Sequence, residues 1–333
     1  MNIKELKDFS FPLDEQFELE VNYKKVKYEF LIKFSSTKKG VVCFGPAAYN
    51  PYEFSPPIYI RSSWHDDLKT STIYYNDPTT YNYQDPSNYQ KPELRAGWGV
   101  GKSEDYYLEN IGKIIHILTE KNGISKEEIV FFGSSAGGFC SIMLATILKS
   151  PLAIANNPTV DTKNHSCFKD MARVCFKNYD DSSPYEHRLN IIEMFKKENY
   201  MPHLIYLINI NSESDFNEFN MLMQSLTSLK TLKNNKLQII AYSDNNGHMG
   251  FYPKEEIISI MEDILDSTNN YQPFSRIHLS EKRIHNELLL KRQQIVELQT
   301  IKGYLKYKTN NIYQRIKKDS WKARLETYFQ TRT

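Results

Sequence analysis

Residues 127–158 read as a strand, a helix and a second strand without a break, and this succession constrains the fold more than any other part of the chain. The run EEIVFFG is apolar and short enough for a buried strand, SSAGGFCSIMLATILK predicts a helix, and LAIANNP predicts a strand with a polar end. A strand, a helix and a strand in this order indicate a right-handed crossover in a parallel sheet. We therefore expect an α/β fold.

The same alternation of strands and helices continues on both sides of this unit. The first two strands have alternating patterns with a Lys-rich turn between them, which favours an antiparallel pair. A long helix is expected to begin at Ser103 as its N-cap and to stop at Gly123. The other strands are expected at 17–23, 27–34, 41–45, 71–77, 203–210 and 237–244, and the other helices at 215–232 and 253–265. The pattern predicts a mostly parallel sheet with helices on both faces.

The chain divides by composition into a globular part and a basic tail. Residues 1–270 are expected to form one domain, in which the irregular, aromatic segment 161–200 is a candidate cap over the site. Residues 272–333 hold 14 Lys/Arg against 5 Asp/Glu, a net charge of +9, whereas the whole chain carries +2. Apolar residues at helical spacing predict one or two amphipathic helices in the tail, 271–333. Such a tail could bind a membrane surface, a partner protein or a polyanionic glycan, or could join copies of a homo-oligomer.

Composition argues against several classes of protein. No long apolar run of about 18 residues is present, and the N-terminus lacks the apolar core of a secretory signal, so we expect a cytoplasmic protein, peripheral at most at the inner membrane face. The four cysteines form neither a C-x-x-C pair nor a Cys/His cluster, so we expect no disulfide and no metal site. No recognition motif accompanies the basic tail, so nucleic acid is not an expected partner.

Residues 133–137 read Gly-Ser-Ser-Ala-Gly, which fits the pattern G-x-S-x-G directly between a predicted strand and a predicted helix. This is the context of a nucleophile elbow, a strained turn that holds a serine hydroxyl above the sheet. Small residues are needed there because larger ones would collide with neighbouring backbone. We expect Ser135 to be the nucleophile and the Ala136 N–H, at the start of the helix, to stabilise an oxyanion. A second oxyanion donor is expected from the backbone of Gly45 or Ala47.

A serine hydroxyl is a poor nucleophile unless a base lies within hydrogen-bonding distance. Among the eight histidines, His248 follows a strand, lies in the loop NNGHMG and precedes the last helix of the domain, which is the expected place of the base. The orienting acid is expected after the strand at 203–210. Asp215 is preferred because it closes that loop before a helix, and Glu213 and Asp244 are the alternatives.

Four further residues are candidates for substrate binding. Arg61, Trp64 and His65 lie in the loop between the third and fourth strands, where a solvated loop around one buried tryptophan is the alternative interpretation. Asn157 follows a strand of the parallel sheet at the edge where ligands tend to bind, although a role in a turn fits the sequence equally well.

The elbow GSSAGG, the strand end NNP at 156–158 and the segments SESDFNEF and NNGHMG resemble the bacterial capsule and surface-polysaccharide O-acetyltransferases of α/β-hydrolase fold, over residues 40–264. The resemblance implies that Ser135, Asp215 and His248 carry acetyl from acetyl-CoA to a sugar hydroxyl. Acetyl-CoA would then be a co-substrate, with no permanently bound cofactor, and a polysaccharide or oligosaccharide would be the acceptor.

Two other functions use the same features and are alternatives. An esterase or deacetylase would use the same three residues with water as the acceptor, because the outcome depends on water exclusion and acceptor binding. A non-catalytic subunit of a glycan-assembly system would use the fold for binding only.

Overall fold

The computed structural model describes residues 1–37, 40–50, 53–81, 94–150, 152–177, 182–229, 237–266, 289–290 and 292–293. The chain divides into two compact units, Met1–Glu281 and Lys282–Thr333. The predicted basic tail lies almost entirely outside the described residues, so the helices expected there and the domain boundary near residue 270 remain predictions. The fold described below is that of the first unit.

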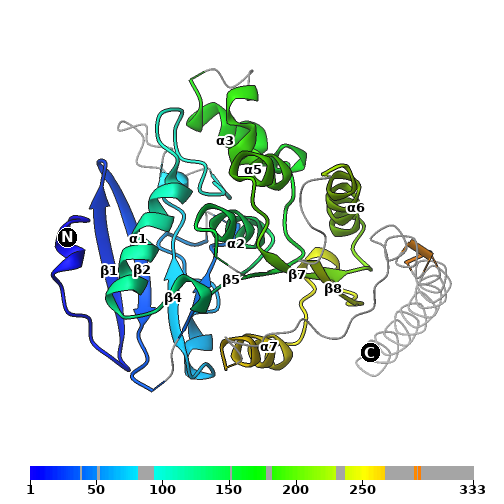
Figure 1. Ribbon diagram of the computed structural model, residues 1–333. Coiled ribbons are helices and arrows are strands. Elements are labelled where there is room, and N and C mark those ends of the chain that lie inside the picture. Colours follow the sequence, from blue (N-terminus) through cyan, green and yellow to red (C-terminus); the bar gives the residue numbers. More distant parts are fainter. Residues whose placement is uncertain are drawn as a thin grey trace, which may run out of the picture. The chain divides into compact units, whose positions relative to one another are not determined.

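A single mixed sheet organises this unit, and its eight strands follow the order β1-β2-β4-β3-β5-β6-β7-β8 (Figure 1). Strand β2 is antiparallel to both of its neighbours, and the strands from β4 to β8 run parallel to one another. The strands are β1 (Gln16–Tyr23), β2 (Val26–Lys33), β3 (Val41–Phe44), β4 (Ser71–Tyr75), β5 (Ile129–Ser134), β6 (Leu152–Asn156), β7 (His203–Asn209) and β8 (Leu237–Tyr242).

The position of each strand in the sheet follows from its apolar pattern. Strands β3 and β6 are buried at every residue, as continuous apolar runs require when helices cover both faces of a parallel sheet. Strand β1, at one edge, alternates between buried and exposed residues over its second half. The expected antiparallel opening pair and the parallel centre of the sheet are therefore both observed.

Helices cover the two faces of the sheet unequally. Figure 1 shows α7 on one side and α2, α5 and α6 on the other. The α-helices are α1 (Tyr107–Lys121), α2 (Ala136–Ile147), α3 (Phe168–Cys175), α4 (Glu186–Leu189), α5 (Ile191–Glu198), α6 (Glu213–Ser228) and α7 (Lys254–Asp266). Short 3₁₀ helices occupy Glu5–Lys7, Ser62–Asp66, Pro78–Tyr81, Lys126–Glu128, Thr162–Asn164, Ser183–Tyr185 and Gly247–Met249.

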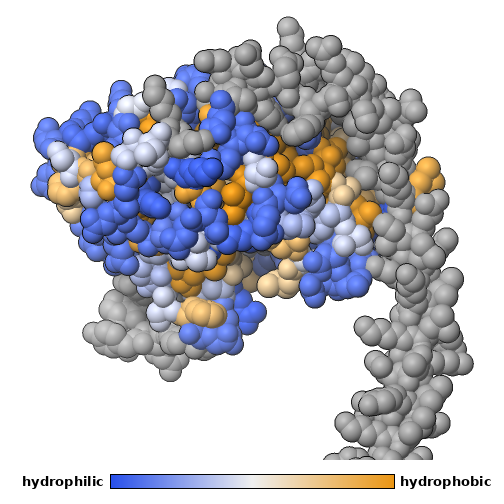
Figure 2. Space-filling view, turned by 90° about the horizontal axis from the view of Figure 1, so that it is seen from below, coloured by the Kyte–Doolittle hydropathy of each residue, from blue (hydrophilic) through white to orange (hydrophobic). Residues whose placement is uncertain are grey.

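A continuous apolar core lies between α7 and the sheet. Ile257 and Met261 of α7 are fully buried against a cluster that includes Val42, Phe132 and Ile154 from three neighbouring strands. At the surface on this side the described residues are mostly hydrophilic, with hydrophobic residues confined to patches (Figure 2). This strand order, with one antiparallel strand and helices on both faces, is the α/β-hydrolase fold expected from the sequence.

Two local expectations differ from the structure. Helix α1 begins at Tyr107 rather than after Ser103, because residues 102–105 form a turn closed by a bridge between Lys102 and Asp105. The Ser103 hydroxyl instead accepts a hydrogen bond from the Lys177 N–H. The segment 161–199, expected to be irregular, contains three α-helices, and α5 buries Ile191 and other apolar residues of its inner face. Within the described residues, no helix is both long and apolar enough to cross a membrane.

Candidate active site

Ser135 stands on a strained turn between β5 and α2. Its φ of 53° and ψ of −122° lie outside the regions that side chains favour, and its N–H donates to the Asn156 carbonyl at 3.0 Å. A Cβ on Gly133 would lie 2.3 Å from the Gly137 carbonyl, and one on Gly137 would lie 2.1 Å from the Pro46 carbonyl oxygen. The turn therefore requires glycine at both flanking positions, as the sequence pattern predicted.

The loop between β8 and α7 brings His248 to this turn. The distance from His248 Nε2 to Ser135 Oγ is 2.9 Å. Asn209, the last residue of β7, anchors the loop because its side-chain amide donates to the carbonyl oxygens of Asp244 and Gly247, at 2.8 Å each. The His248 side chain is 41% exposed, so the base and the hydroxyl are accessible from solvent.

Asp215, in the first turn of α6, is the acid that lies beside His248. Its Oδ1 lies 2.5 Å from His248 Nδ1, and its side chain is 3% exposed. The other two acids considered lie elsewhere: Glu213 is exposed, and the Asp244 carboxylate accepts the Asn246 N–H within the loop. Of the three alternatives, the structure brings Asp215 to the histidine.

The electrostatics of these three groups suit a base. The hydrogen bond to Asp215 raises the pKa of His248 above its ordinary value of 6.5, against the effect of burial. In the neutral ring, Nδ1–H donates to Asp215 and Nε2 is free to accept the Ser135 proton. Protonation during a reaction would create an imidazolium ion beside a buried carboxylate, which stabilises it.

The sequence offered Ala136 and either Gly45 or Ala47 as backbone donors to an oxyanion. Ala136 is the first residue of α2, so its N–H has no acceptor within the helix and is available to an oxyanion. Gly45, one of the two expected second donors, is excluded because its N–H already donates to the Phe132 carbonyl at 2.8 Å. Ala47 remains the candidate, and the neighbouring Pro46 carbonyl packs directly against Gly137.

The candidate substrate-binding residues from the early loop separate into two groups. Arg61 lies at the site, where its Nη2 donates to the Ser134 hydroxyl at 2.8 Å. Trp64 instead belongs to the core: it is 7% exposed and packs on Phe132 with ring centroids 5.6 Å apart. His65 contacts the Gln16 side chain on β1, at the far edge of the sheet from β5. Trp64 thus fits the interpretation of a loop around one buried tryptophan, whereas a binding role for His65 stays a prediction.

Of the two roles left open for Asn157, its contacts favour a structural one. Its side chain is buried, with 1% of the residue exposed, and its Oδ1 accepts the Asn209 N–H at 2.8 Å. Its Nδ2 donates to the Tyr242 hydroxyl at 3.0 Å and to the Gly250 carbonyl at 3.3 Å. Asn157 therefore ties the ends of β6, β7 and β8 to the loop that carries His248, and its amide faces protein rather than substrate.

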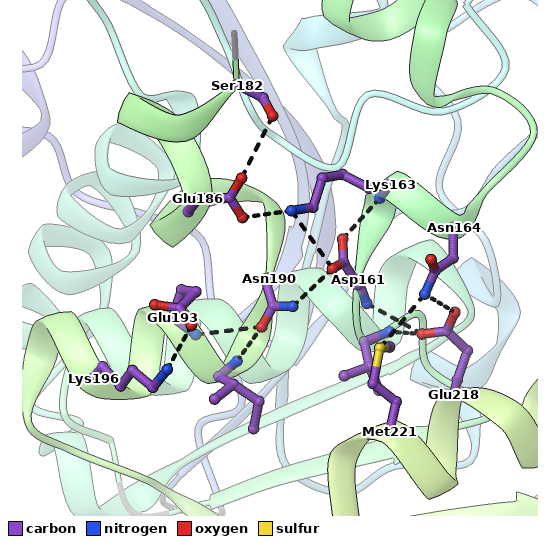
Figure 3. Close-up of polar contacts among 12 residues, drawn as sticks. Asp161, Lys163, Asn164, Ser182, Glu186, Asn190, Glu193, Lys196, Glu218 and Met221 are labelled. Atoms are coloured by element: carbon purple, nitrogen blue, oxygen red, sulfur yellow. Dashed lines mark hydrogen bonds and ion pairs between the residues drawn. The ribbon is translucent and has the colours of Figure 1, made fainter. Parts of the chain in front are cut away.

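A polar network fastens the candidate cap segment to α6, the helix that carries Asp215 (Figure 3). Glu218 Oε2 accepts the backbone N–H groups of Val160 and Asp161, at 2.6 and 3.1 Å. The Asp161 carboxylate in turn accepts the Asn190 amide at 2.9 Å. Burial raises the pKa of Glu218, which its two backbone donors partly offset. This network holds the segment after β6 against the helix that positions the acid.

Sequence reasoning missed Trp98 and His165. Their rings meet edge to face with centroids 5.1 Å apart, and Trp98 is 1% exposed with a φ of 49°. Burial lowers the pKa of His165, and the charge of His248 lowers it further. The one available signal was the tryptophan between two glycines, at residues 97–99. Within the described residues, no group of three or more His, Cys, Asp or Glu could hold a metal ion.

Solved structures share this fold at low sequence identity. A mutant of the capsule O-acetyltransferase of Neisseria meningitidis serogroup A, in complex with CoA, is 16% identical with a TM-score of 0.50, covering 73% of this chain and 96% of that one. Dipeptidyl peptidase 4 of Porphyromonas gingivalis is 10% identical with a TM-score of 0.52, over 77% and 36%. A glycosylation-associated protein complex of Streptococcus agalactiae is 15% identical with a TM-score of 0.51, over 76% and 47%.

At these identities the likeness concerns the fold. No curated protein matches the chain. A family model does match: residues 96–271, which include the elbow, α6 and the His248 loop, fit the prolyl oligopeptidase family. Because this match spans more than half of the 333 residues, the chain belongs to the prolyl oligopeptidase family.

Proposed function

We propose that this protein is a serine acyltransferase that moves acetyl from acetyl-CoA to a hydroxyl of a bacterial surface polysaccharide. The observation that carries the proposal is the continuous hydrogen-bonded chain from Ser135 through His248 to the buried Asp215. The position of Ser135 on a glycine-flanked elbow supports the same proposal, because its hydroxyl lies at the N-terminus of α2.

In the proposed first step, His248 takes the Ser135 proton while Oγ attacks the carbonyl carbon of the thioester. The Ala136 N–H, together with the candidate donor Ala47, would stabilise the oxyanion of the tetrahedral intermediate. Collapse of the intermediate breaks the C–S bond, His248 returns the proton to the leaving thiolate, and the acetyl group remains on Ser135.

In the second step the acceptor replaces the thiol. His248 removes the proton of a sugar hydroxyl, whose oxygen attacks the acetyl-enzyme, and Ser135 leaves as the restored alcohol. The capsule O-acetyltransferase with which the fold is shared has been solved with CoA, and this supports acetyl-CoA as the donor.

Hydrolysis is the second candidate function, and the family match favours it because it names a peptidase family. With water in place of the sugar hydroxyl, the same steps give an esterase, deacetylase or peptidase. Transferases differ from hydrolases in how well they bind the acceptor and exclude water, not in the three catalytic groups.

Two measurements test the proposal in sequence. A fluorophosphonate probe should label the wild-type protein, and Ser135→Ala should abolish the label while leaving the thermal unfolding temperature nearly unchanged. Labelling that persists in the folded Ser135→Ala variant would reject Ser135 as the nucleophile.

The second measurement separates transfer from hydrolysis. CoA release from acetyl-CoA is followed with a thiol reagent, with and without capsular oligosaccharides, and the oligosaccharides are then analysed by mass spectrometry. Transfer predicts release that depends on the acceptor, together with acetylated oligosaccharide. Release that is independent of the acceptor and yields only acetate would establish the hydrolase instead.

A further inference from the structure

Arg61 is placed at the junction of the two loops that carry the candidate nucleophile and base. Its Nη2 donates to the hydroxyl of Ser134, the residue directly before Ser135, at 2.8 Å. Its guanidinium carbon lies 4.4 Å from the ring centroid of Phe251, three residues after His248. The backbone of Arg61 is left-handed, with a φ of 65°, a conformation that residues other than glycine seldom adopt.

The charge of Arg61 has no compensating carboxylate among the described residues. Burial alone lowers its pKa to about 10, and no acidic group acts on it. A guanidinium offers five N–H donors, and the described protein accepts one of its hydrogen bonds, through an uncharged hydroxyl. The remaining donors are left for another acceptor.

Aromatic rings line the other sides of the guanidinium. Besides Phe251, the rings of Phe132 and Trp64 lie 5.6 and 5.7 Å from its central carbon. Such contacts offset only part of the desolvation cost of a buried charge. The guanidinium is largely buried, yet the residue keeps part of its surface exposed.

We propose that Arg61 binds an oxyanionic group of the substrate, a phosphate or a carboxylate, next to the reacting serine. A planar guanidinium binds such groups through two parallel hydrogen bonds, and a half-buried position strengthens them. This inference rests on the proposed function, because it treats the groups beside Ser135 as a substrate site. Two sources supply the same chemistry: the phosphates of the acyl donor CoA, or the acid groups of an acidic glycan acceptor.

Equilibrium binding distinguishes these sources without requiring turnover. Isothermal titration calorimetry would compare CoA with pantetheine, which lacks the phosphates, and trigalacturonate with the neutral maltotriose. We expect the wild-type protein to bind the charged member of at least one pair about tenfold or more tightly, equivalent to about 1.4 kcal/mol. The pair that shows this preference identifies the source of the anion.

Variants then assign the preference to Arg61. Arg61→Gln should abolish it, and Arg61→Lys, which keeps the charge but not the fork, should keep part of it. Arg61→Met retains an apolar stem against Phe251 and serves as a second neutral variant if the glutamine variant fails to fold. Lys254→Gln is the matched control, since Lys254 Nζ lies 5.7 Å from the Trp64 ring centroid but is paired with Asp67.

The outcomes separate clearly. Loss of the preference in the neutral Arg61 variants, with the preference kept in Lys254→Gln, supports the inference. It is overturned if wild-type protein prefers neither charged ligand, if Lys254→Gln loses as much as Arg61→Gln, or if Arg61 variants weaken charged and neutral ligands equally. Fluorophosphonate labelling of Ser135 in the same samples tests the proposed function separately, so either idea can fail alone.

Discussion

Replacing Asp215 with asparagine isolates the contribution of the buried acid to the candidate site. The carboxylate is 3% exposed and lies 2.5 Å from His248 Nδ1, so it acts directly on the charge that the ring acquires as it takes the Ser135 proton. The charge centres lie farther apart than these two atoms. At a separation of about 4 Å and an effective dielectric constant of about 20, the lost attraction is about 4 kcal/mol.

That loss corresponds to about 10³-fold in rate, and an incorrect tautomer enlarges it. An asparagine amide can donate to Nδ1, which would leave the ring proton on Nε2, where the Ser135 hydroxyl needs an acceptor. We therefore expect kcat/KM for 4-nitrophenyl acetate to fall about 10³- to 10⁴-fold.

The pH profile gives an independent readout of the same change. The hydrogen bond to Asp215 raises the pKa of His248 above 6.5, and the base must be neutral, so wild-type activity should rise with pH through a midpoint above that value. In Asp215→Asn this cause is removed while burial remains, so the midpoint should move to lower pH.

Glu213→Gln is the matched control, because Glu213 is an exposed acid in the same turn of α6. Its kcat/KM should change by less than about twofold, as expected for an exposed site without a catalytic partner. A folded Asp215→Asn variant that loses less than tenfold and keeps the wild-type midpoint would refute the assignment of the acid.

Two further predictions concern the scaffold of the site. Gly137→Ala would place a Cβ 2.1 Å from the Pro46 carbonyl oxygen, and we expect the free energy of unfolding to fall by about 3 kcal/mol or more. Gly112→Ala in α1 is the control, because its Cβ meets only ordinary contacts, the nearest at 3.4 Å. It should raise the free energy of unfolding by up to about 1 kcal/mol. Equal free energies for the two variants in urea unfolding would contradict the close approach at the elbow. Asn157→Ala removes three side-chain hydrogen bonds at a residue with a φ of 45°. The free energy of unfolding should therefore fall by about 2–4 kcal/mol. A loss below about 1 kcal/mol would argue against its proposed role in tying the strand ends to the His248 loop.

Local pattern was sufficient for the strands and for the elbow. The apolar runs and their breakers located the central strands because these are buried on both faces of a parallel sheet, and alternation located the opening antiparallel pair. The elbow could be predicted because the serine and the small residues that its strained backbone requires lie within five consecutive positions, 133–137. The start of α1 was misjudged because residues 102–105 form a local turn, and Ser103 is hydrogen-bonded to Cys175 and Lys177, more than seventy positions away, rather than capping the helix.

The roles of the residues around the elbow could be assigned only from the folded structure. The sequence does not distinguish Gly45 from Ala47 as the second oxyanion donor. In the structure, the Gly45 N–H donates to the Phe132 carbonyl of β5 and is therefore not available to an oxyanion. Asn157 follows β6 at an edge of the sheet where ligands often bind, but its side-chain amide is hydrogen-bonded to three neighbouring segments. Trp98 and His165 carried no pattern in the sequence, and their edge-to-face contact joins two segments that lie far apart in the chain.

The sequence alone determined the α/β architecture and the position of the candidate nucleophile, because periodicity and the strand–turn–helix pattern act over short distances along the chain. Tertiary structure decided which acid faces His248 and which backbone N–H groups remain available. It also placed Arg61 beside Ser134 with no carboxylate partner among the residues that the structure describes. These properties depend on side chains that meet from segments far apart in the chain. Their burial and their partners arise only when the sheet assembles.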